Sequence, residues 1–330
     1  MADAEVGLLA GIGQRFLDFC ERFGGHFRQR TRTVETSVQH YVRGLLQAET
    51  KNMERMEEAI PEADHQALQH LVSESAWSER AVLDQVAQDA NRLLGGHADS
   101  ALLIDESGCP KKGTRSVGVA RQWCGQLGKV ENCQVGVFAA LSRGPEVTLI
   151  DGRWFLPEGW TRDPARGQAA GIPVAQRGFQ RKTDLALAMI VHARQQGLGF
   201  AWVGFDGFYG SDPGFLRALD DRGEVFVGDV HKDQRIYLED PRPLVPPAKT
   251  VHGRPPTRLQ AQTSAVRIDR WTQQQPATAW QPVTLRQGTK GALRVEILHR
   301  RVWLWDGHQP QARQWRLIVR REIDDPTEIK

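Results

Sequence analysis

Two aspartates that close apolar runs are the residues of this sequence best suited to chemistry. Asp105 ends the run "LLID" and Asp206 ends the run "AWVGFD". Hard cations such as Mg²⁺ bind carboxylate oxygens, so two such side chains supply half of a divalent metal site. Two metal ions about 4 Å apart can activate an attacking oxygen and stabilise the leaving oxygen at a phosphodiester. Either aspartate alone could instead cap a turn, so the chemistry requires a fold that makes the two strands neighbours.

The residues next to the aspartates suggest how a substrate could approach. Gly108 and Gly207 follow within three residues, and the missing side chains would let a substrate backbone come close. Glu106 could support the metal ligands, but we favour a solvated turn residue. Tyr209, in "DGFYG", is more simply explained as a packed aromatic side chain than as part of the site.

Basic residues just beyond Asp105 are candidates for contacts with a phosphate backbone. Lys111 and Lys112 suit this role because the ammonium group acts as a point charge toward phosphate, although a solvated loop explains them equally well. Arg115 and Arg121 support the same interpretation more weakly.

The four cysteines, Cys20, Cys109, Cys124 and Cys133, form no CxxC pair. They are too few and too irregularly spaced for a disulfide framework. We expect free buried thiols, and a zinc site made by the last three with a histidine is the less favoured alternative.

The basic charge lies mainly in the last quarter of the chain. Residues 241–330 contain 16 Lys and Arg against 7 Asp and Glu, so this segment carries +9 and residues 1–240 carry −6 of the net +3. Such a segment is typical of a polyanion-binding surface, although a basic solvated face is about as common. Arg300 and Arg301 are its candidate phosphate contacts. Five tryptophans there are expected mainly in a core, with one of them available to stack on a DNA base: Trp271, Trp280, Trp303, Trp305 and Trp315.

The elements that must position these residues follow from hydrophobic periodicity. The first 97 residues predict helices over 15–23, 38–60, 64–74 and 78–94, with Ser78 as a cap and Gly95 as a stop. Their basic cluster, Arg28, Arg30 and Arg32, would have a binding role only if the three side chains were gathered on one face. From residue 101 the pattern predicts strands over 101–105, 134–141, 146–155, 200–206 and 225–230, and helices over 182–197 and 212–223.

Three consecutive strands with short connections predict an antiparallel meander, and the later helical crossovers predict parallel strands, so the sheet should be mixed. Residues 232–270 are rich in Pro and Arg and predict an irregular segment. Strand patterns return in "PVTLRQ", "LRVEILHRRVWLWDG" and "WRLIVRREI".

The composition is that of a globular protein, with 40% hydrophobic and 25% charged residues. No apolar run reaches the roughly 18 residues that span a bilayer. The N-terminus lacks a basic segment before its short apolar patch, so no secretion signal is predicted. We therefore expect a cytoplasmic protein without a membrane partner.

Several segments together resemble the DDE transposases of bacterial insertion sequences. They are "LLIDESGCPKKGTRSVGVARQWCGQLGKVENCQVGVFAAL", "DGRWFLPEGWTRD", "FQRKTDLALAMI" and "FAWVGFDGFYGSDPGFLRAL". The resemblance runs from about residue 40 to the end and is densest over 101–216. It implies an α/β fold, an RNase H-like mixed sheet flanked by helices, with a helical N-terminal domain and a β-rich insertion. The implied domains are 1–97 for DNA-end binding, 98–231 for the first part of the catalytic core, and 232–330 for the basic insertion.

The resemblance also implies a site and its partners. Asp105 and Asp206 match the first two catalytic acids, with Mg²⁺ or Mn²⁺ as cofactor and double-stranded DNA as substrate. A homodimer is the implied working form, and association with the nucleoid follows from the DNA substrate. The third acid should be a Glu on a helix after the last insertion strand, in a context like R-W-x-I-E. Neither Glu322 nor Glu328 has that setting, so no third acid is assigned.

Three functions remain open from the sequence. The first is a transposase that cleaves and transfers strands at insertion-sequence ends, either whole or as the front part of a longer enzyme. The second is a truncated, catalytically inactive DNA-binding protein or repressor. The third, a phosphohydrolase with an aspartyl nucleophile, is the least favoured, because that chemistry needs a second Asp where this chain has Ser107.

Overall fold

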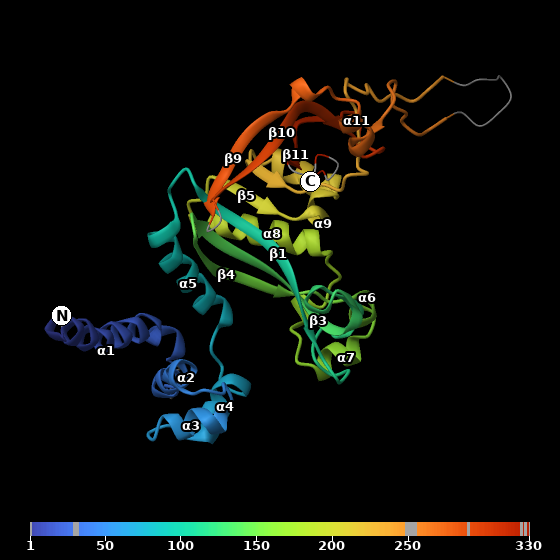
Figure 1. Cartoon of the computed structure of the whole chain (residues 1–330). Coiled ribbons are helices and arrows are strands. Elements are labelled where there is room, and N and C mark those ends of the chain that lie inside the picture. The colour runs from blue at the N-terminus through green and yellow to red at the C-terminus, as the bar shows by residue number, and fades with distance from the viewer. Residues whose placement is uncertain are drawn as a thin grey trace. The chain divides into compact units, whose positions relative to one another are not determined.

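A computed structural model describes residues 2–28, 33–247, 256–288, 291–323, 326 and 329. The chain forms two compact units (Figure 1). One contains Met1–Gly95 with Gln196–Leu198, and the other contains Gly96–Gln195 with Gly199–Lys330. Arg30, Arg32 and Glu328, which the sequence analysis considered, lie outside the described residues. No helix in the described part of the chain is both long and apolar enough to cross a membrane.

The first unit is helical, as its periodicity predicts. Two small apolar cores hold it together, one around Phe23, Phe27 and Leu71 and the other around Met56 and Leu68. The helices are α1 (Ala2–Gly24), α2 (Glu35–Gln47), α3 (Met53–Ala59), α4 (His65–Ser73) and α5 (Glu79–Leu94), with a 3-10 turn at Gly25–Phe27.

Two helix-end predictions in this unit have different outcomes. Ser78 caps α5, since its hydroxyl accepts a hydrogen bond from the Ala81 amide at 3.2 Å, which confirms the prediction. The single helix predicted over 38–60 is wrong, because α2 ends at Gln47 and α3 begins at Met53. The Asn52 side chain accepts a hydrogen bond from the Arg55 amide at 2.9 Å, and this capping bond starts a new helix where the apolar spacing alone suggested continuity.

The second unit is built on a six-stranded mixed sheet. In the order β4-β3-β1-β5-β6, the pairs among β4, β3 and β1 are antiparallel, and β5 and β6 add parallel to β1. The short β2 pairs antiparallel with the first residues of β3. The strands are β1 (Ser100–Pro110), β2 (Ala120–Cys124), β3 (Lys129–Arg143), β4 (Glu146–Trp154), β5 (Trp202–Phe205) and β6 (Phe226–Gly228).

Helices connect the later strands, as expected from the crossovers. The chain passes through α8 (Lys182–Gln195) on its way to β5 and through α9 (Gly207–Gly210) and α10 (Pro213–Asp220) on its way to β6. Asp212 caps α10 by accepting hydrogen bonds from the Gly214 and Phe215 amides, which confirms that predicted helix start. Short helices α6 (Glu158–Thr161) and α7 (Pro164–Ala169), which the sequence analysis did not predict, follow β4. This architecture confirms the predicted RNase H-like class.

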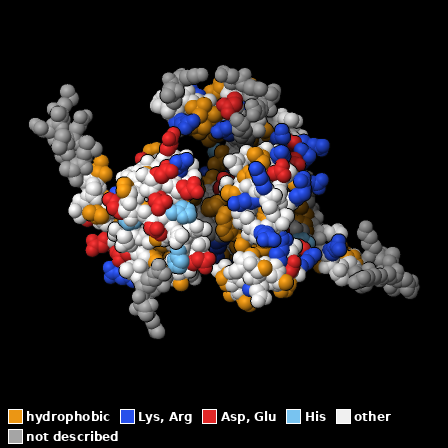
Figure 2. Space-filling model, turned by 90° about the horizontal axis from the view of Figure 1, so that it is seen from below, with side chains coloured by type: hydrophobic (Ala, Val, Ile, Leu, Met, Phe, Trp, Pro, Cys, Tyr) orange, Lys and Arg blue, Asp and Glu red, His pale blue; other side chains and the backbone are white. Residues whose placement is uncertain are grey.

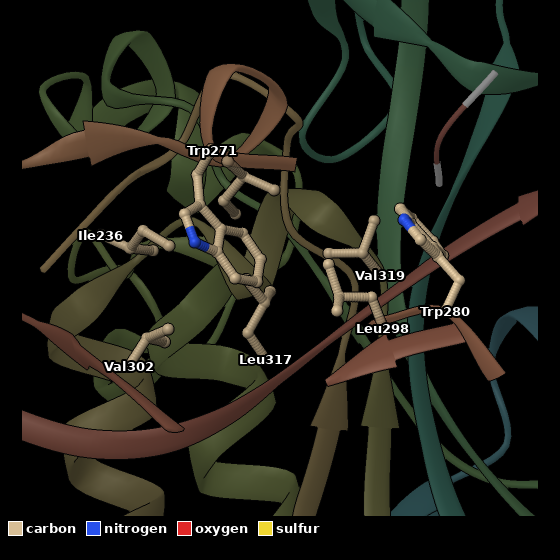
Figure 3. Close-up of a cluster of buried hydrophobic side chains, with 8 residues drawn as sticks. Ile236, Trp271, Trp280, Leu298, Val302, Leu317 and Val319 are labelled. Atoms are coloured by element: carbon tan, nitrogen blue, oxygen red, sulfur yellow. The ribbon is translucent and has the colours of Figure 1, made fainter. Parts of the chain in front are cut away.

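The β-rich segment after β6 has its own core. Figure 3 shows the Trp271 ring among aliphatic side chains, and Trp280 beside Leu298 and Val319. Both tryptophans are buried, whereas Trp303, Trp305 and Trp315 are half-buried, so the expectation that most of the five belong to a core holds fully for two of them. The elements are β7 (Arg235–Ile236), β8 (Val266–Arg267), α11 (Ile268–Gln273), β9 (Gln281–Gly288), β10 (Gly291–Leu304) and β11 (Arg313–Glu322), the last three forming an antiparallel sheet in the order β11-β10-β9.

This segment is fastened to the larger sheet and its helices by charge and ring contacts. Arg217 of α10 pairs with Asp306, and Arg313 of β11 bonds Asp220 at 2.9 Å. The rings of Phe226 and Trp315 meet edge to face with centroids 5.9 Å apart. The second compact unit therefore includes both the mixed sheet and the β-rich segment.

Candidate active site

The parallel pairing of β1 with β5 brings the two aspartates together. The last pair in that ladder is Ile104 with Phe205, so Asp105 and Asp206 are the next residue on each strand. Both side chains are exposed and line one pocket of about 350 Å³. The other lining residues are Glu106, Ser107, Gly108, Trp123, Gly125, Gln126 and Val135. Asp105 and Asp206 are far apart in sequence. They share one pocket because the helical crossover through α8 returns the chain to a position beside β1.

Each aspartate uses one oxygen locally. Asp105 Oδ1 accepts a hydrogen bond from the Glu106 amide at 2.7 Å, and Asp206 Oδ1 accepts one from the Phe208 amide at 3.1 Å, where it caps α9. Among the described residues, the second oxygen of each carboxylate has no hydrogen-bond partner. Two hard oxygen donors at the edge of an open pocket fit a divalent cation such as Mg²⁺, which binds through one or two carboxylates and fills its remaining positions with water and substrate oxygens. No cluster of three His, Cys, Asp or Glu with metal-binding geometry occurs in the described part of the chain.

The strand that carries Asp105 does not end there, contrary to the sequence analysis. β1 continues to Pro110, because the residues from Asp105 to Pro110 remain paired with β3. What ends at Ile104 is the parallel ladder with β5. Asp105 therefore lies where β1 changes from two hydrogen-bonded neighbours to one, and this loss of a neighbour exposes its side chain.

Glu106 is not the solvated turn residue that the sequence analysis favoured. It lies within β1, and its carboxylate is 2.7 Å from the Lys182 ammonium at the start of α8. The Glu106 and Lys182 side chains are only 18% and 14% exposed. The Lys182 nitrogen also lies 5.5 Å from the Phe155 ring centroid and 5.2 Å from that of Phe208. Glu106 thus contributes a paired, half-buried charge to the wall of the pocket.

Tyr209 is fully buried, which confirms the expectation of a packed aromatic residue. Its ring packs against Phe208 and Phe215. Burial raises the pKa of Tyr209, and the negative charges of Glu106 and Asp206 raise it further. Its phenol therefore stays protonated at neutral pH.

The two glycines have different surroundings. Gly108 is buried, and a Cβ there would lie 3.0 Å from Cys124 Sγ and 3.1 Å from Cys124 Cα. Gly108 thus lets the end of β2 approach β1, and it also lines the pocket of the aspartates. A Cβ on Gly207 would meet His231 Cε1 at 3.5 Å, an ordinary contact.

The predicted phosphate contacts fall in two places. Lys111, Lys112 and Arg115 are exposed in the connection after β1, and Arg121 is exposed on β2. Asn132 holds this connection by donating its side-chain amide to the Lys111 and Gly113 carbonyls. None of the four lines the pocket of the aspartates.

Arg300 and Arg301 are exposed on β10 in the β-rich segment. As successive strand residues they point to opposite faces of their sheet. Arg300 lies 6.0 Å from the Trp271 ring centroid. On the face of the molecule in Figure 2, Lys and Arg side chains are interspersed with acidic and apolar ones.

Trp123 is one of the pocket residues that the sequence analysis missed. It lies on β2, a strand that was not predicted, pairs across the strands with Val130 and is 54% exposed. The segment "ARQWC" has no regular polar and apolar alternation, so its strand structure follows from pairing with the first residues of β3 and not from a local signal. The structure also corrects one cysteine: Cys109 is exposed, whereas Cys20, Cys124 and Cys133 are buried free thiols as expected.

Glu322, considered as a third acid, ends strand β11 and lies 3.5 Å from Arg320.

The comparison with known proteins places the chain in a family. The family model of the DDE superfamily endonucleases matches residues 22–292. A probable transposase for insertion sequence element IS701 of Microchaete diplosiphon is 25% identical over 226 residues, which cover 68% of this chain and 56% of that protein. Since the family model spans most of the chain, this protein belongs to the DDE superfamily of endonucleases.

Proposed function

We propose that this chain acts on DNA as part of an insertion-sequence transposase, with Asp105 and Asp206 as ligands of its catalytic divalent metal, Mg²⁺ or Mn²⁺. The observation that carries the proposal is the meeting of these two carboxylates at the end of the β1–β5 ladder, in one pocket. A divalent cation bound there would supply Lewis-acid stabilisation of charge at a phosphodiester. DDE endonucleases are a metal-using family, and the similarity to a probable transposase supports DNA ends as the substrate.

The chain's own residues would orient the DNA. The backbone amides of Glu106 and Phe208 fix one oxygen of each aspartate, so the other oxygens keep a set direction toward the pocket. Lys111, Lys112 and the weaker candidates Arg115 and Arg121 would contact phosphates on the side of β1 and β2. Arg300 and Arg301 would do so from the β-rich segment, and the helical unit would contribute to recognition of the ends. The homodimer suggested by the resemblance is part of the same proposal.

DNA cleavage tests the site. The chain is incubated with Mg²⁺ or Mn²⁺ and a duplex carrying the terminal sequences that flank its coding region, alongside Asp105→Asn and Asp206→Asn. Glu146→Gln, which changes an exposed carboxylate at the start of β4, is the matched control. We expect cleavage by the parent and the control, and none by the two aspartate variants. Metal-dependent cleavage that survives either substitution would refute the assignment, and binding without any cleavage would favour the inactive DNA-binding alternative.

Salt dependence tests the lysines separately. Each phosphate contact contributes about 0.9 to the slope of log affinity against log salt. Lys111→Ala with Lys112→Ala should therefore lower that slope by about 2. Lys129→Ala, an exposed lysine on β3, should leave it unchanged. An unchanged slope in the double variant would remove these two lysines from the DNA contact.

A further inference from the structure

Side chains hold the connection between β1 and β2, residues 111–119, by donating to its carbonyl oxygens. Asn132 of β3 donates its side-chain amide to the Lys111 carbonyl at 2.6 Å and to the Gly113 carbonyl at 2.9 Å. In return, the Lys111 amide donates to the Asn132 carbonyl at 2.9 Å. Carbonyls of exposed connections are commonly left to water, so a side chain that binds two of them fixes the backbone over residues 111–113.

The same connection is fastened from α6 and α7, which lie beside the ends of β1 and β3 in Figure 1. Arg166 of α7 donates to the Thr114 carbonyl at 2.8 Å. Its guanidinium carbon lies 3.7 Å from the ring centroid of Trp160, and the Trp160 indole donates to the Val119 carbonyl at 2.8 Å. Stacking on the ring limits the directions that the guanidinium can take, so the Thr114 carbonyl also has a fixed direction.

These bonds decide where the neighbouring amides point. Across a trans peptide, the carbonyl of one residue and the N–H of the next point in opposite directions, and the described residues contain no cis peptide bond. The N–H groups of Lys112 and Thr114 therefore point away from Asn132, because the carbonyls before them are bound to it. The N–H of Arg115 likewise points away from Arg166.

The three outward amides are available to a ligand. In the part of the chain that the structure describes, none of them donates a hydrogen bond to another residue. Lys112, Thr114 and Arg115 are all exposed. Uncommitted N–H groups close together in a turn form a common kind of anion site, and the cationic side chains of Lys112 and Arg115 add charge to it.

We propose that the amides of Lys112, Thr114 and Arg115 bind phosphate groups of the DNA backbone, held in place by Asn132 and Arg166 as positioning residues. The inference rests on the proposed action on DNA and adds a backbone site to the basic side chains. Contacts with phosphate place a protein along the duplex and read no sequence, so the site should accept any DNA sequence. These donors are set in direction before DNA arrives, whereas a lysine side chain has to be ordered on binding.

Amide hydrogen exchange of the full chain, labelled with ¹⁵N-lysine, tests the site directly. The duplex with the terminal sequences is added without divalent metal, and Lys111→Arg and Lys112→Arg identify the two signals by their loss. In the free chain the Lys111 amide, bonded to the Asn132 carbonyl, should exchange slowly, and the Lys112 amide should exchange fast. Bound duplex should slow exchange at Lys112 by about 10-fold or more, because a hydrogen bond to an anion must open first, and should leave Lys111 unchanged.

Substitutions test the positioning residues. Asn132→Leu adds no charge and releases both carbonyls that Asn132 binds, so it should lower affinity for the duplex about 10-fold and abolish the protection at Lys112. Gln122→Leu also removes two bonds from a side chain to backbone carbonyls and should bind like the parent, which controls for general loss of stability. Arg166→Leu should weaken binding more than Arg162→Leu, which removes an exposed guanidinium of the same segment.

The outcomes separate this inference from the proposed function. Binding of the duplex by the parent with unchanged exchange at Lys112 would overturn the inference and leave the action on DNA standing. The same conclusion would follow if Asn132→Leu and Gln122→Leu bound the duplex equally well. Failure of the parent to bind the duplex would overturn the proposed function and this inference with it.

Discussion

Replacing Lys182 by Met should destabilise the second compact unit, because it leaves the Glu106 carboxylate without its cation. The two charges are 2.7 Å apart, and their side chains are 14% and 18% exposed. At an effective dielectric constant of 20 their attraction is about 6 kcal/mol, much of it offset by the cost of desolvating both groups. Removing one partner of a buried pair costs about 3–5 kcal/mol, and the residual exposure here reduces this to about 2–3 kcal/mol.

The assay is thermal unfolding of Lys182→Met, Glu106→Gln and the double variant. For a unit of this size, about 2–4 °C is lost per kcal/mol, so each single change should lower Tm by about 5–10 °C. The double variant leaves no unpaired charge and should recover a large part of the loss. Arg162→Met, at the exposed pair with Glu158, should shift Tm by no more than about 2 °C. Additive losses in the double variant would refute the reasoning, since independent sites add and coupled ones do not.

Three further predictions concern other parts of the molecule. Gly210→Ala should cost about 3 kcal/mol in unfolding experiments, because its Cβ would lie 1.9 Å from the Asp229 carbonyl oxygen, whereas Gly159→Ala, which has open space, should be tolerated. Alkylation of the folded chain at pH 8 should modify the exposed Cys109 and spare Cys133, because burial raises the pKa of the Cys133 thiol to about 11. Modification of Cys133 at pH 8 would contradict its burial. Since the thiol pKa is raised on folding, the stability linked to the Cys133 proton is present below about pH 9 and is lost as pH rises toward 11. Ser78→Ala should destabilise the helical unit by about 1 kcal/mol in chemical denaturation, and an effect near zero would contradict the capping role.

The strands that carry Asp105 and Asp206 could be predicted from the sequence because apolar runs mark both β1 and β5. That the two strands are neighbours was implied by the family resemblance, since the chain between them contains three further strands as well as α8. The register follows from the pairing that ends at Ile104 and Phe205. Strand order and register together place Asp105 and Asp206, the residues that follow this last pair, at the same edge of the sheet.

Other features depended on contacts that no local pattern records. The continuation of β1 past Asp105 depends on its pairing with β3, and a Gly-Cys-Pro sequence gives no sign of that partner. The burial of Glu106 depends on Lys182, which comes from a helix far along the chain. Similarly, Phe155, Phe179 and Phe208 lie in separate segments and form a cavity only after folding.

Local iron-mediated cleavage of the chain tests most directly whether the carboxylates from β1 and β5 form one cation site. Fe²⁺ with ascorbate and peroxide would replace the divalent ion and cut the backbone nearest to where it binds. The account predicts two cuts, one near Asp105 and one near Asp206, both lost in Asp105→Asn and both suppressed by excess Mg²⁺. A cut near only one aspartate, or two cuts that persist unchanged in Asp105→Asn, would contradict it.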